Sequence, residues 1–252
     1  MKRYQKLIKI LLAFSLVGFL CLSGTAWAIP ALQVYIEGGT YNDGTDSWEI
    51  TTSDPIRIWT IGAVGAIGTI FDVKLAVAYD TGLNPLISLN STTTGGFGGV
   101  LDPSTPGAAT YIRTSADGEI PKLGGGSDLP SHGIYQTGTT FQEFALGDFT
   151  LTDSNIGDWN GSTPFPTTLN KLGQVNVYVF SFSNAPQGTT FHFDLYDHIQ
   201  AQNGARYISA PYSHDGDGTN VHMPEPGTIF LMGSGLAGLG FWRFRKGTKN
   251  QA

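Results

Sequence analysis

Hydrophobic and polar residues alternate in several short runs between residues 29 and 222. A period of two is typical of half-buried β-strands, because successive side chains of a strand point to opposite faces. The clearest runs predict strands at residues 32–36, 71–77, 175–179 and 191–195. Shorter runs predict further strands at 48–52, 56–61, 110–113, 141–146 and 207–208. No run in this region repeats with the period of an amphipathic helix, about 3.6 residues.

Turn-forming residues separate these runs, as in Asn42-Asp43-Gly44, Asp80-Thr81-Gly82 and Asp117-Gly118. Many short strands joined by polar turns predict an all-β fold, here a single antiparallel β-sandwich of the jelly-roll or immunoglobulin-like type. The segment 89–133 is rich in Gly, Ser, Thr and Pro. We expect it to form long loops on the sandwich without a second core, and residues 213–223 to form a linker.

The first 28 residues have the three parts of a secretory signal peptide. Four basic residues precede a hydrophobic run at 10–22, and Ala26-Trp27-Ala28 follows as an A-x-A cleavage site. We expect cleavage after Ala28, directed by Ala26 and Ala28. Cys21, the only cysteine, lies within this peptide. The mature chain is therefore predicted to contain no disulfide and no thiolate metal site.

Residues 223–247 form a second targeting segment, again in three parts. Pro224-Glu225-Pro226 comes first, and its two prolines favour an extended backbone. The uncharged stretch 228–242 predicts a transmembrane helix of about 22 Å, shorter than a hydrocarbon core of about 30 Å. Arg243, Arg245 and Lys246 follow, and basic residues beside a span are held on the cytoplasmic side. The predicted topology places the domain of residues 29–222 outside and the tail inside.

These three parts, in this order, closely resemble the PEP-CTERM sorting signal. In that family a Pro-Glu-Pro motif, a short hydrophobic helix and an arginine-rich end are recognised by an exosortase, a transpeptidase-like membrane enzyme. The resemblance covers residues 224–246, and its basic cluster, Arg-Phe-Arg-Lys, is more dilute than is usual. It implies export in a Gram-negative bacterium, an inner-membrane intermediate, and delivery to the cell surface or the extracellular matrix. The alternative is a C-terminal anchor helix that no enzyme cleaves.

Acidic and basic residues are distributed unevenly along the chain. Residues 29–222 contain six of the 14 Lys and Arg and 19 of the 20 Asp and Glu, which leaves this domain with a net charge of about −13. Nucleic-acid binding needs a basic surface, so the composition excludes nucleic acid as a partner. An acidic surface suits an exported soluble domain and attracts divalent cations.

The domain between the targeting segments resembles the choice-of-anchor type N proteins. The resemblance runs through most of residues 31–215. It implies an extracellular domain joined to one of several interchangeable surface anchors, and it assigns no catalytic residues. The stretches that carry it are Ala31-Leu-Gln-Val-Tyr-Ile-Glu-Gly-Gly39, Ile58-Trp-Thr-Ile-Gly62, Phe71-Asp-Val-Lys-Leu-Ala-Val77, Leu146-Gly-Asp-Phe-Thr-Leu-Thr-Asp153, Phe191-His-Phe-Asp-Leu-Tyr-Asp-His198 and Ser213-His-Asp215.

Two short stretches contain candidate metal ligands. On a strand, His192 and Asp194 point to the same face, about 7 Å apart, within reach of one ion. The alternative is that they belong to the polar face of a sandwich strand. Asp215 and Asp217 alternate with glycine, as oxygen ligands do in calcium loops, but the remaining ligands of an EF-hand are absent. The alternative for this pair is a turn-rich linker. We therefore assign no metal or other cofactor, and keep calcium as the ion to consider.

Catalytic signals are weak in this chain. It contains no Gly-x-Ser-x-Gly motif, and its mature part has no cysteine. We therefore predict a non-enzymatic protein, structural in the biofilm matrix. The alternative is an exopolysaccharide-binding module, assisted by calcium. A hydrolase would need two acidic residues to converge in one groove. Aromatic residues that could stack on sugars are Tyr35, Trp48, Trp59, Trp159 and Tyr196, although core packing is the default expectation for most of them.

Overall fold

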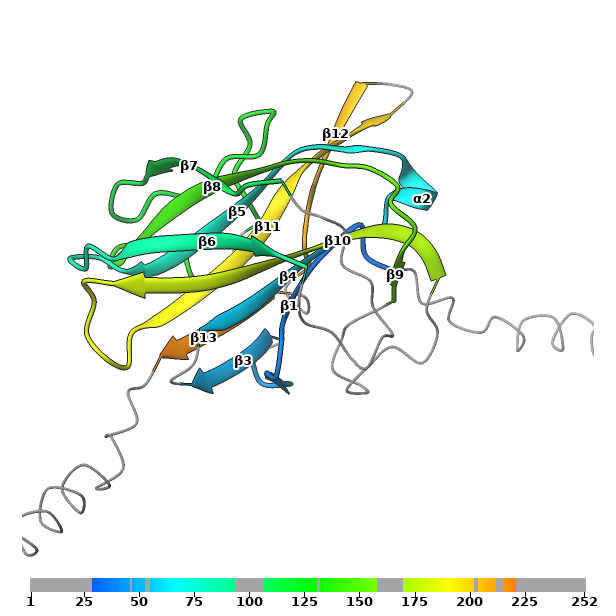
Figure 1. Cartoon of the computed structure of the whole chain (residues 1–252). Helices are drawn as coiled ribbons and strands as arrows, with labels where there is room; N and C mark the ends of the chain where they lie inside the picture. Colours follow the sequence, from blue (N-terminus) through cyan, green and yellow to red (C-terminus); the bar gives the residue numbers. More distant parts are fainter. Residues whose placement is uncertain are drawn as a thin grey trace, which may run out of the picture.

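The part of the chain that the structure describes is nearly all β, as the alternating runs predict (Figure 1). The computed structural model describes residues 29–45, 47–52, 55–93, 107–130, 132–157, 170–201, 204–211 and 215–220. Within these residues, every strand predicted from alternation lies inside an observed strand. Among them the only helix is the single turn α2 (Val64–Ile67).

The smaller of two sheets is built around the long strand β10 (Asn170–Ser183). The strand order is β1 (Leu32–Ile36), β4 (Ile56–Gly62), β10 and β6 (Leu86–Thr92). The short strand β9 (Ser154–Ile156) also pairs with β10. All of these pairs are antiparallel.

The larger sheet has β11 (Thr190–Ala201) and β5 (Ile70–Asp80) near its centre. Its order is β2 (Thr40–Asn42), β3 (Ser47–Thr52), β13 (Asp215–Asn220), β11, β5, β8 (Thr139–Phe149) and β7 (Thr110–Thr114), and β12 (Gly204–Ser209) also pairs with β11. The predicted antiparallel pairing is wrong for one pair, since β3 and β13 run parallel. The jelly-roll or immunoglobulin-like sandwich type stays a prediction.

Side chains from both sheets form one large hydrophobic core. Val73 and Leu75 of β5, and Phe191 and Phe193 of β11, point into it from alternate positions of their strands. Both phenylalanines are fully buried. Burying such a side chain contributes about 1.5–3 kcal/mol each. The alternation in the sequence therefore marks the residues whose side chains pack between the larger sheet and the smaller one.

The opposite face of β5 and β11 is also covered. The segment 115–138 lies over it and contributes to a second, smaller hydrophobic cluster. The sequence predicts long loops here without a second core, and the described residues of this segment are indeed loops, but the sequence did not indicate the small cluster. The reason is that central strands have two faces, and this segment supplies apolar side chains for the outer one. The cluster consists of Ala76, Ala78, Leu123, Leu129, Tyr135, Phe141 and Tyr196.

The predicted linker at residues 213–223 is wrong for its central part, because residues 215–220 form β13 between β3 and β11. Gly216 and Gly218 make this possible. A Cβ atom at Gly216 would lie 2.7 Å from Ile36 Cδ1, and one at Gly218 would lie 2.6 Å from Ile56 Cδ1. The Asp-Gly-Asp-Gly sequence therefore looks like a turn but fits a strand that packs closely on the core.

The described aromatic residues considered for sugar stacking lie in the hydrophobic clusters, which confirms the default expectation of core packing. Tyr35, Trp48, Trp59 and Tyr196 are at most 3% exposed. Tyr35 packs edge-to-face against Trp48, with ring centroids 4.8 Å apart, and against Trp59 at 6.2 Å. Trp159 lies outside the described residues. The four described rings stabilise the interior and do not form a binding platform.

Candidate metal centre

Strands β11 and β13 bring together the two candidate stretches. His192 and Asp194 occupy alternate positions of β11, so both point away from the main core. β13 runs antiparallel beside β11 with His192 opposite Asp217. Asp215 lies two residues earlier on β13 and therefore shares this face. Four candidate residues from two separate stretches meet because these strands are neighbours.

The neighbouring strand β5 leaves space for this group. Its residues opposite His192 and Asp194 are Ala78 and Ala76. The small alanine side chains do not fill the volume above the sheet. The segment 115–138 closes over it, and from this segment His132 reaches the same point. His132 was not among the predicted ligands, because nothing in its local sequence marks it as one.

His132, His192, Asp194 and Asp215 form what we call the His–Asp cluster. One ligand atom from each lies within 4.8 Å of the corresponding atom of every other. The two histidine Nε2 atoms are 2.9 Å apart. Asp194 Oδ2 lies 3.1 Å from His192 Nε2 and 3.3 Å from His132 Nε2. Asp215 Oδ2 lies 3.7 and 3.9 Å from the same two nitrogens.

The cluster is buried. The four side chains are between 3% and 8% exposed. His192 and Asp194 thus lie on the outer, polar face of their strand, and this face is covered rather than exposed to solvent. Buried ionisable groups must be paired or bind a cation, since an isolated buried charge is strongly unfavourable.

A second layer of contacts orients the ligand atoms. His192 Nδ1 lies 2.8 Å from Asp217 Oδ1, and Asp217 Oδ2 accepts a hydrogen bond of 3.0 Å from Ser47 Oγ. His132 Nδ1 lies 3.3 Å from the carbonyl oxygen of Pro130. Because a carboxylate and a carbonyl accept hydrogen bonds, each Nδ1 carries the proton. Both Nε2 atoms then face the centre of the cluster, and each presents a lone pair there when its ring is neutral.

The hydroxyl of Tyr135 donates a hydrogen bond of 2.6 Å to Asp194 Oδ2. Burial raises the pKa of Tyr135 well above its ordinary value, and the charge of Asp194 acts in the same direction. Tyr135 therefore remains a neutral donor. It fixes the Asp194 carboxylate beside both histidines, and sequence reasoning missed it as well.

The carboxyl groups of the cluster have opposite pKa shifts. Burial raises the pKa of Asp215 to about 8, opposed by His192 and assisted by the nearby charges of Asp194 and Asp217. Burial also acts to raise the pKa of Asp194, but His192 and His132 outweigh it and lower that pKa below its ordinary value. Burial acts to lower the pKa of His192, and Asp194 and Asp217 raise it well above the ordinary value. Without a cation, these shifts favour an imidazolium–carboxylate pair between His192 and Asp194 and the protonated form of Asp215.

Asp197 and His198, which follow in the same strand, are not part of the cluster. Asp197 Oδ2 lies 3.1 Å from Lys74 Nζ, and Asp197 Oδ1 lies 2.8 Å from His198 Nδ1. The ring of His198 stacks on Phe71, with centroids 5.7 Å apart. His198 is therefore a natural comparison residue, a histidine on the same strand with different partners.

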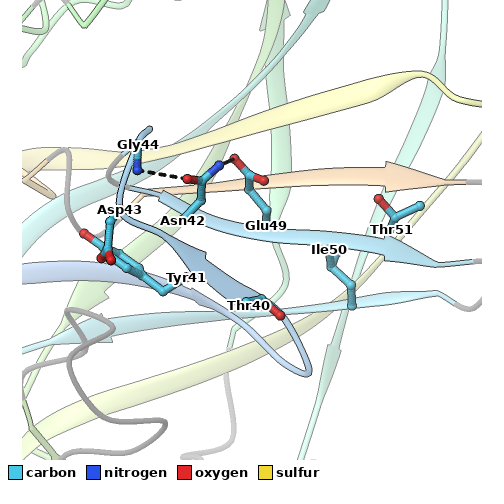
Figure 2. A pocket seen from close by; sticks show the side chains of 8 residues that line it. All are labelled: Thr40, Tyr41, Asn42, Asp43, Gly44, Glu49, Ile50 and Thr51. Carbon is cyan, nitrogen blue, oxygen red and sulfur yellow. Dashed lines mark hydrogen bonds between the residues drawn. The ribbon is translucent and has the colours of Figure 1, made fainter.

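A separate open hollow lies at the start of the larger sheet, around strands β2 and β3 (Figure 2). Figure 2 shows the side chain of Asn42 between the backbone nitrogen of Gly44 and the carboxylate of Glu49. These two hydrogen bonds measure 2.9 and 2.8 Å. The hollow is lined by Thr40, Tyr41, Asn42, Asp43, Gly44, Glu49, Ile50 and Thr51.

The predicted targeting residues lie outside the described part of the chain. This applies to the sorting residues Pro224, Glu225, Pro226, Arg243, Arg245 and Lys246, to Ala26 and Ala28, and to the predicted transmembrane helix at 228–242. Among the described residues, no helix has the length and apolar character needed to cross a membrane.

Comparison with known proteins identifies the tail. Residues 224–246 match the PEP-CTERM protein-sorting motif. This motif marks proteins that an exosortase processes, and it indicates export through the membrane to the cell surface. No curated protein matches the chain. The match covers only the tail, so it leaves the role of the β domain open.

Two solved structures are distantly similar. One is AvmM, described as catalysing macrocyclization in alchivemycin A biosynthesis, at 8% identity and a TM-score of 0.30, with 78% of this chain and 92% of that chain covered. The other is a DUF4466 family protein from Parabacteroides merdae, at 13% identity and a TM-score of 0.17, with 73% and 44% covered. Likenesses this weak support no argument about fold or function.

Proposed function

We propose that this chain is a non-enzymatic protein that an exosortase delivers to the cell surface, where its β domain is a structural component of the biofilm matrix. The observation that carries the proposal is the sorting motif at residues 224–246. The resemblance of residues 31–215 to choice-of-anchor type N proteins agrees with a surface domain on an interchangeable anchor, and it stays a prediction.

The physical layout of the tail supports this route. The stretch 228–242 is uncharged and is followed by Arg243, Arg245 and Lys246. Basic residues resist transfer across the membrane, so the tail halts there while the acidic domain is already outside. Pro224 and Pro226 keep the preceding backbone extended, which suits entry into an enzyme's cleft.

Variants of the tail test the sorting step. We expect Glu225→Ala, or loss of the three basic residues Arg243, Arg245 and Lys246, to leave an uncleaved precursor in the membrane fraction. Lys249→Ala is the matched control, because Lys249 is a basic tail residue outside the matched motif. Immunoblots of membrane and surface fractions would follow processing. Unchanged processing in both motif variants would contradict the proposal.

The non-enzymatic assignment is supported by the burial of the His–Asp cluster. Its side chains are 3–8% exposed, so a polymeric substrate would not reach them in this conformation. The cluster is therefore better suited to hold the domain together than to act on a ligand.

The second candidate function is exopolysaccharide binding at the hollow beside β2 and β3. The observation that favours it is the position of Tyr41 beside Asn42, Asp43 and Glu49, because sugars are bound by aromatic rings together with amide and carboxylate groups. Calorimetric titration with the host's polysaccharide, with and without calcium, would test it. Tyr41 is half-buried, and Tyr111 is an exposed tyrosine outside the hollow. Binding lost in Tyr41→Ala and kept in Tyr111→Ala would support this function, provided that the Tyr41→Ala variant remains folded. A flat titration of the wild-type chain would exclude it.

A further inference from the structure

We propose that His132, His192, Asp194 and Asp215 form a structural binding site for a divalent transition-metal ion, with Zn²⁺ the best fit. This inference concerns the interior of the β domain and is independent of how the tail is processed.

The spacing of the ligand atoms fits a tetrahedral ion. Zinc binds imidazole nitrogen and carboxylate oxygen at about 2.0–2.2 Å, which places tetrahedral ligand atoms about 3.3–3.6 Å from one another. The five nitrogen–nitrogen and nitrogen–oxygen distances given above run from 2.9 to 3.9 Å, and all four ligand atoms lie within 4.8 Å of one another. A small expansion between the histidines and a small contraction towards Asp215 would centre the ion.

The orientation of the histidines points to the same conclusion. With each Nδ1 proton directed to Asp217 or to the carbonyl of Pro130, the two Nε2 atoms face each other at 2.9 Å, and in neutral rings both would present lone pairs. Two facing lone pairs repel unless a proton or a cation lies between them. Histidine ligands of metals commonly donate their other nitrogen to a carboxylate or a backbone carbonyl, as both do here.

Asp215 supplies an independent observation. It is 2% exposed, and its Oδ1 atom has no hydrogen-bond partner among the residues that the structure describes. Leaving a buried carboxylate oxygen unsatisfied costs more than a hydrogen bond contributes. Its other oxygen is directed at the two histidines. A cation at the centre of the cluster would compensate this carboxylate directly.

The donor set selects the class of ion. Calcium and magnesium prefer ligand shells made of oxygen atoms, whereas imidazole suits zinc and other late transition metals. Two imidazoles and two carboxylates in a roughly tetrahedral arrangement therefore favour Zn²⁺ over the calcium considered from the sequence. Four protein ligands with little exposure also leave no open position, which is typical of structural rather than catalytic zinc sites.

Such an ion would join three distant parts of the chain. His132 comes from the segment that covers the larger sheet, His192 and Asp194 from β11, and Asp215 from the start of β13. His132 and His192 are 60 residues apart in the sequence. Since the mature chain has no cysteine, a metal would provide the cross-link that disulfides give other exported domains.

The test is the metal content and metal-dependent stability of the full-length chain. The wild-type chain is first stripped with a chelator and then reconstituted with Zn²⁺. We expect it to retain about one ion per chain, measured by elemental mass spectrometry. We also expect it to unfold at a higher temperature than the stripped form. Co²⁺ in its place should give the visible absorption bands of tetrahedral cobalt. Neither readout on the wild-type chain depends on the folding of a variant.

His132→Ala and His198→Ala form a matched pair. His132→Ala should lose the bound ion and the zinc-dependent rise in unfolding temperature, while its stripped form unfolds like stripped wild type. His198→Ala should keep both, because His198 lies outside the cluster. A wild-type chain that retains no transition metal after reconstitution, or that binds Ca²⁺ in preference to Zn²⁺, would overturn the proposal. Equal metal content in both variants would overturn it as well.

Discussion

The contact between His192 and Asp217 shows how a single pair sets the chemistry of the cluster. Asp217 is held by Ser47 on one side and by His192 Nδ1 on the other. This arrangement fixes which imidazole nitrogen faces the centre. Asp217 is therefore a positioning residue in the proposed metal site, although its own oxygens lie outside the four-ligand set.

Replacing Asp217 by asparagine tests this role. Asp217→Asn keeps an oxygen that accepts the Nδ1 proton but removes the negative charge that strengthens the imidazole as a ligand. We expect zinc affinity to fall by about 10–100-fold, with the unfolding temperature of the stripped protein nearly unchanged. Competition with a chromophoric chelator would measure the affinity, and Asp43→Asn at the exposed turn is the control. Equal affinity in the two variants would show that Asp217 has no part in binding.

Two buried tyrosines make the domain sensitive to alkali. Burial raises the pKa of Tyr35 and of Tyr178 from 10.0 to about 12. Because the folded state favours the neutral phenols, their contribution to stability is fully present below pH 10. It is lost as the pH rises from about 10 through 12.

We therefore expect the free energy of unfolding to fall with rising pH across that window. The fall should be smaller in the double variant Tyr35→Phe/Tyr178→Phe, whose side chains do not titrate. Urea unfolding at several pH values would measure both. A folded protein in which tyrosinate absorbance shows every tyrosine ionising near pH 10 would contradict the expectation.

Strands β11 and β13 differ in how well their sequences predict their structure. The alternating hydrophobic residues of β11 predict a strand, and the structure confirms it. The Asp-Gly-Asp-Gly sequence of β13 has low strand propensity and predicts a turn, yet its glycines allow a close fit against Ile36 and Ile56. The pairing of β13 with β11 spans distant residues, so no local pattern could show that the two candidate stretches form one site.

The glycines of β13 can be tested directly. A Cβ atom at Gly216 would lie 2.7 Å from Ile36 Cδ1 and 2.9 Å from Ile36 Cγ1 in a filled core. We expect Gly216→Ala to lower the free energy of unfolding by about 1–3 kcal/mol through overpacking. Gly107→Ala is the control, because no described atom lies within 4 Å of a Cβ there. Chemical denaturation would compare them, and equal stability of the two variants would mean that β13 is not packed as described.

The whole molecule combines an exported β domain with a sorting tail. The domain has a net charge of about −13, whereas the segment after residue 242 contains only basic charged residues. β13 ends at Asn220, four residues before Pro224. A metal ion at Asp215 would therefore stabilise the domain close to the point in the sequence where the tail begins.

The sequence predicted the strands, the tail and three of the four ligands as candidates, but not the histidine that completes the cluster.

The central claim, sorting by an exosortase, is tested most directly by the intact mass of the protein recovered from the cell surface and the medium. We predict a mass that lacks Met1–Ala28 and also lacks the residues that follow Pro224-Glu225-Pro226. This result would establish processing at both ends. A mass that retains the chain through Ala252 would contradict the account, because the tail would then act as an uncleaved anchor.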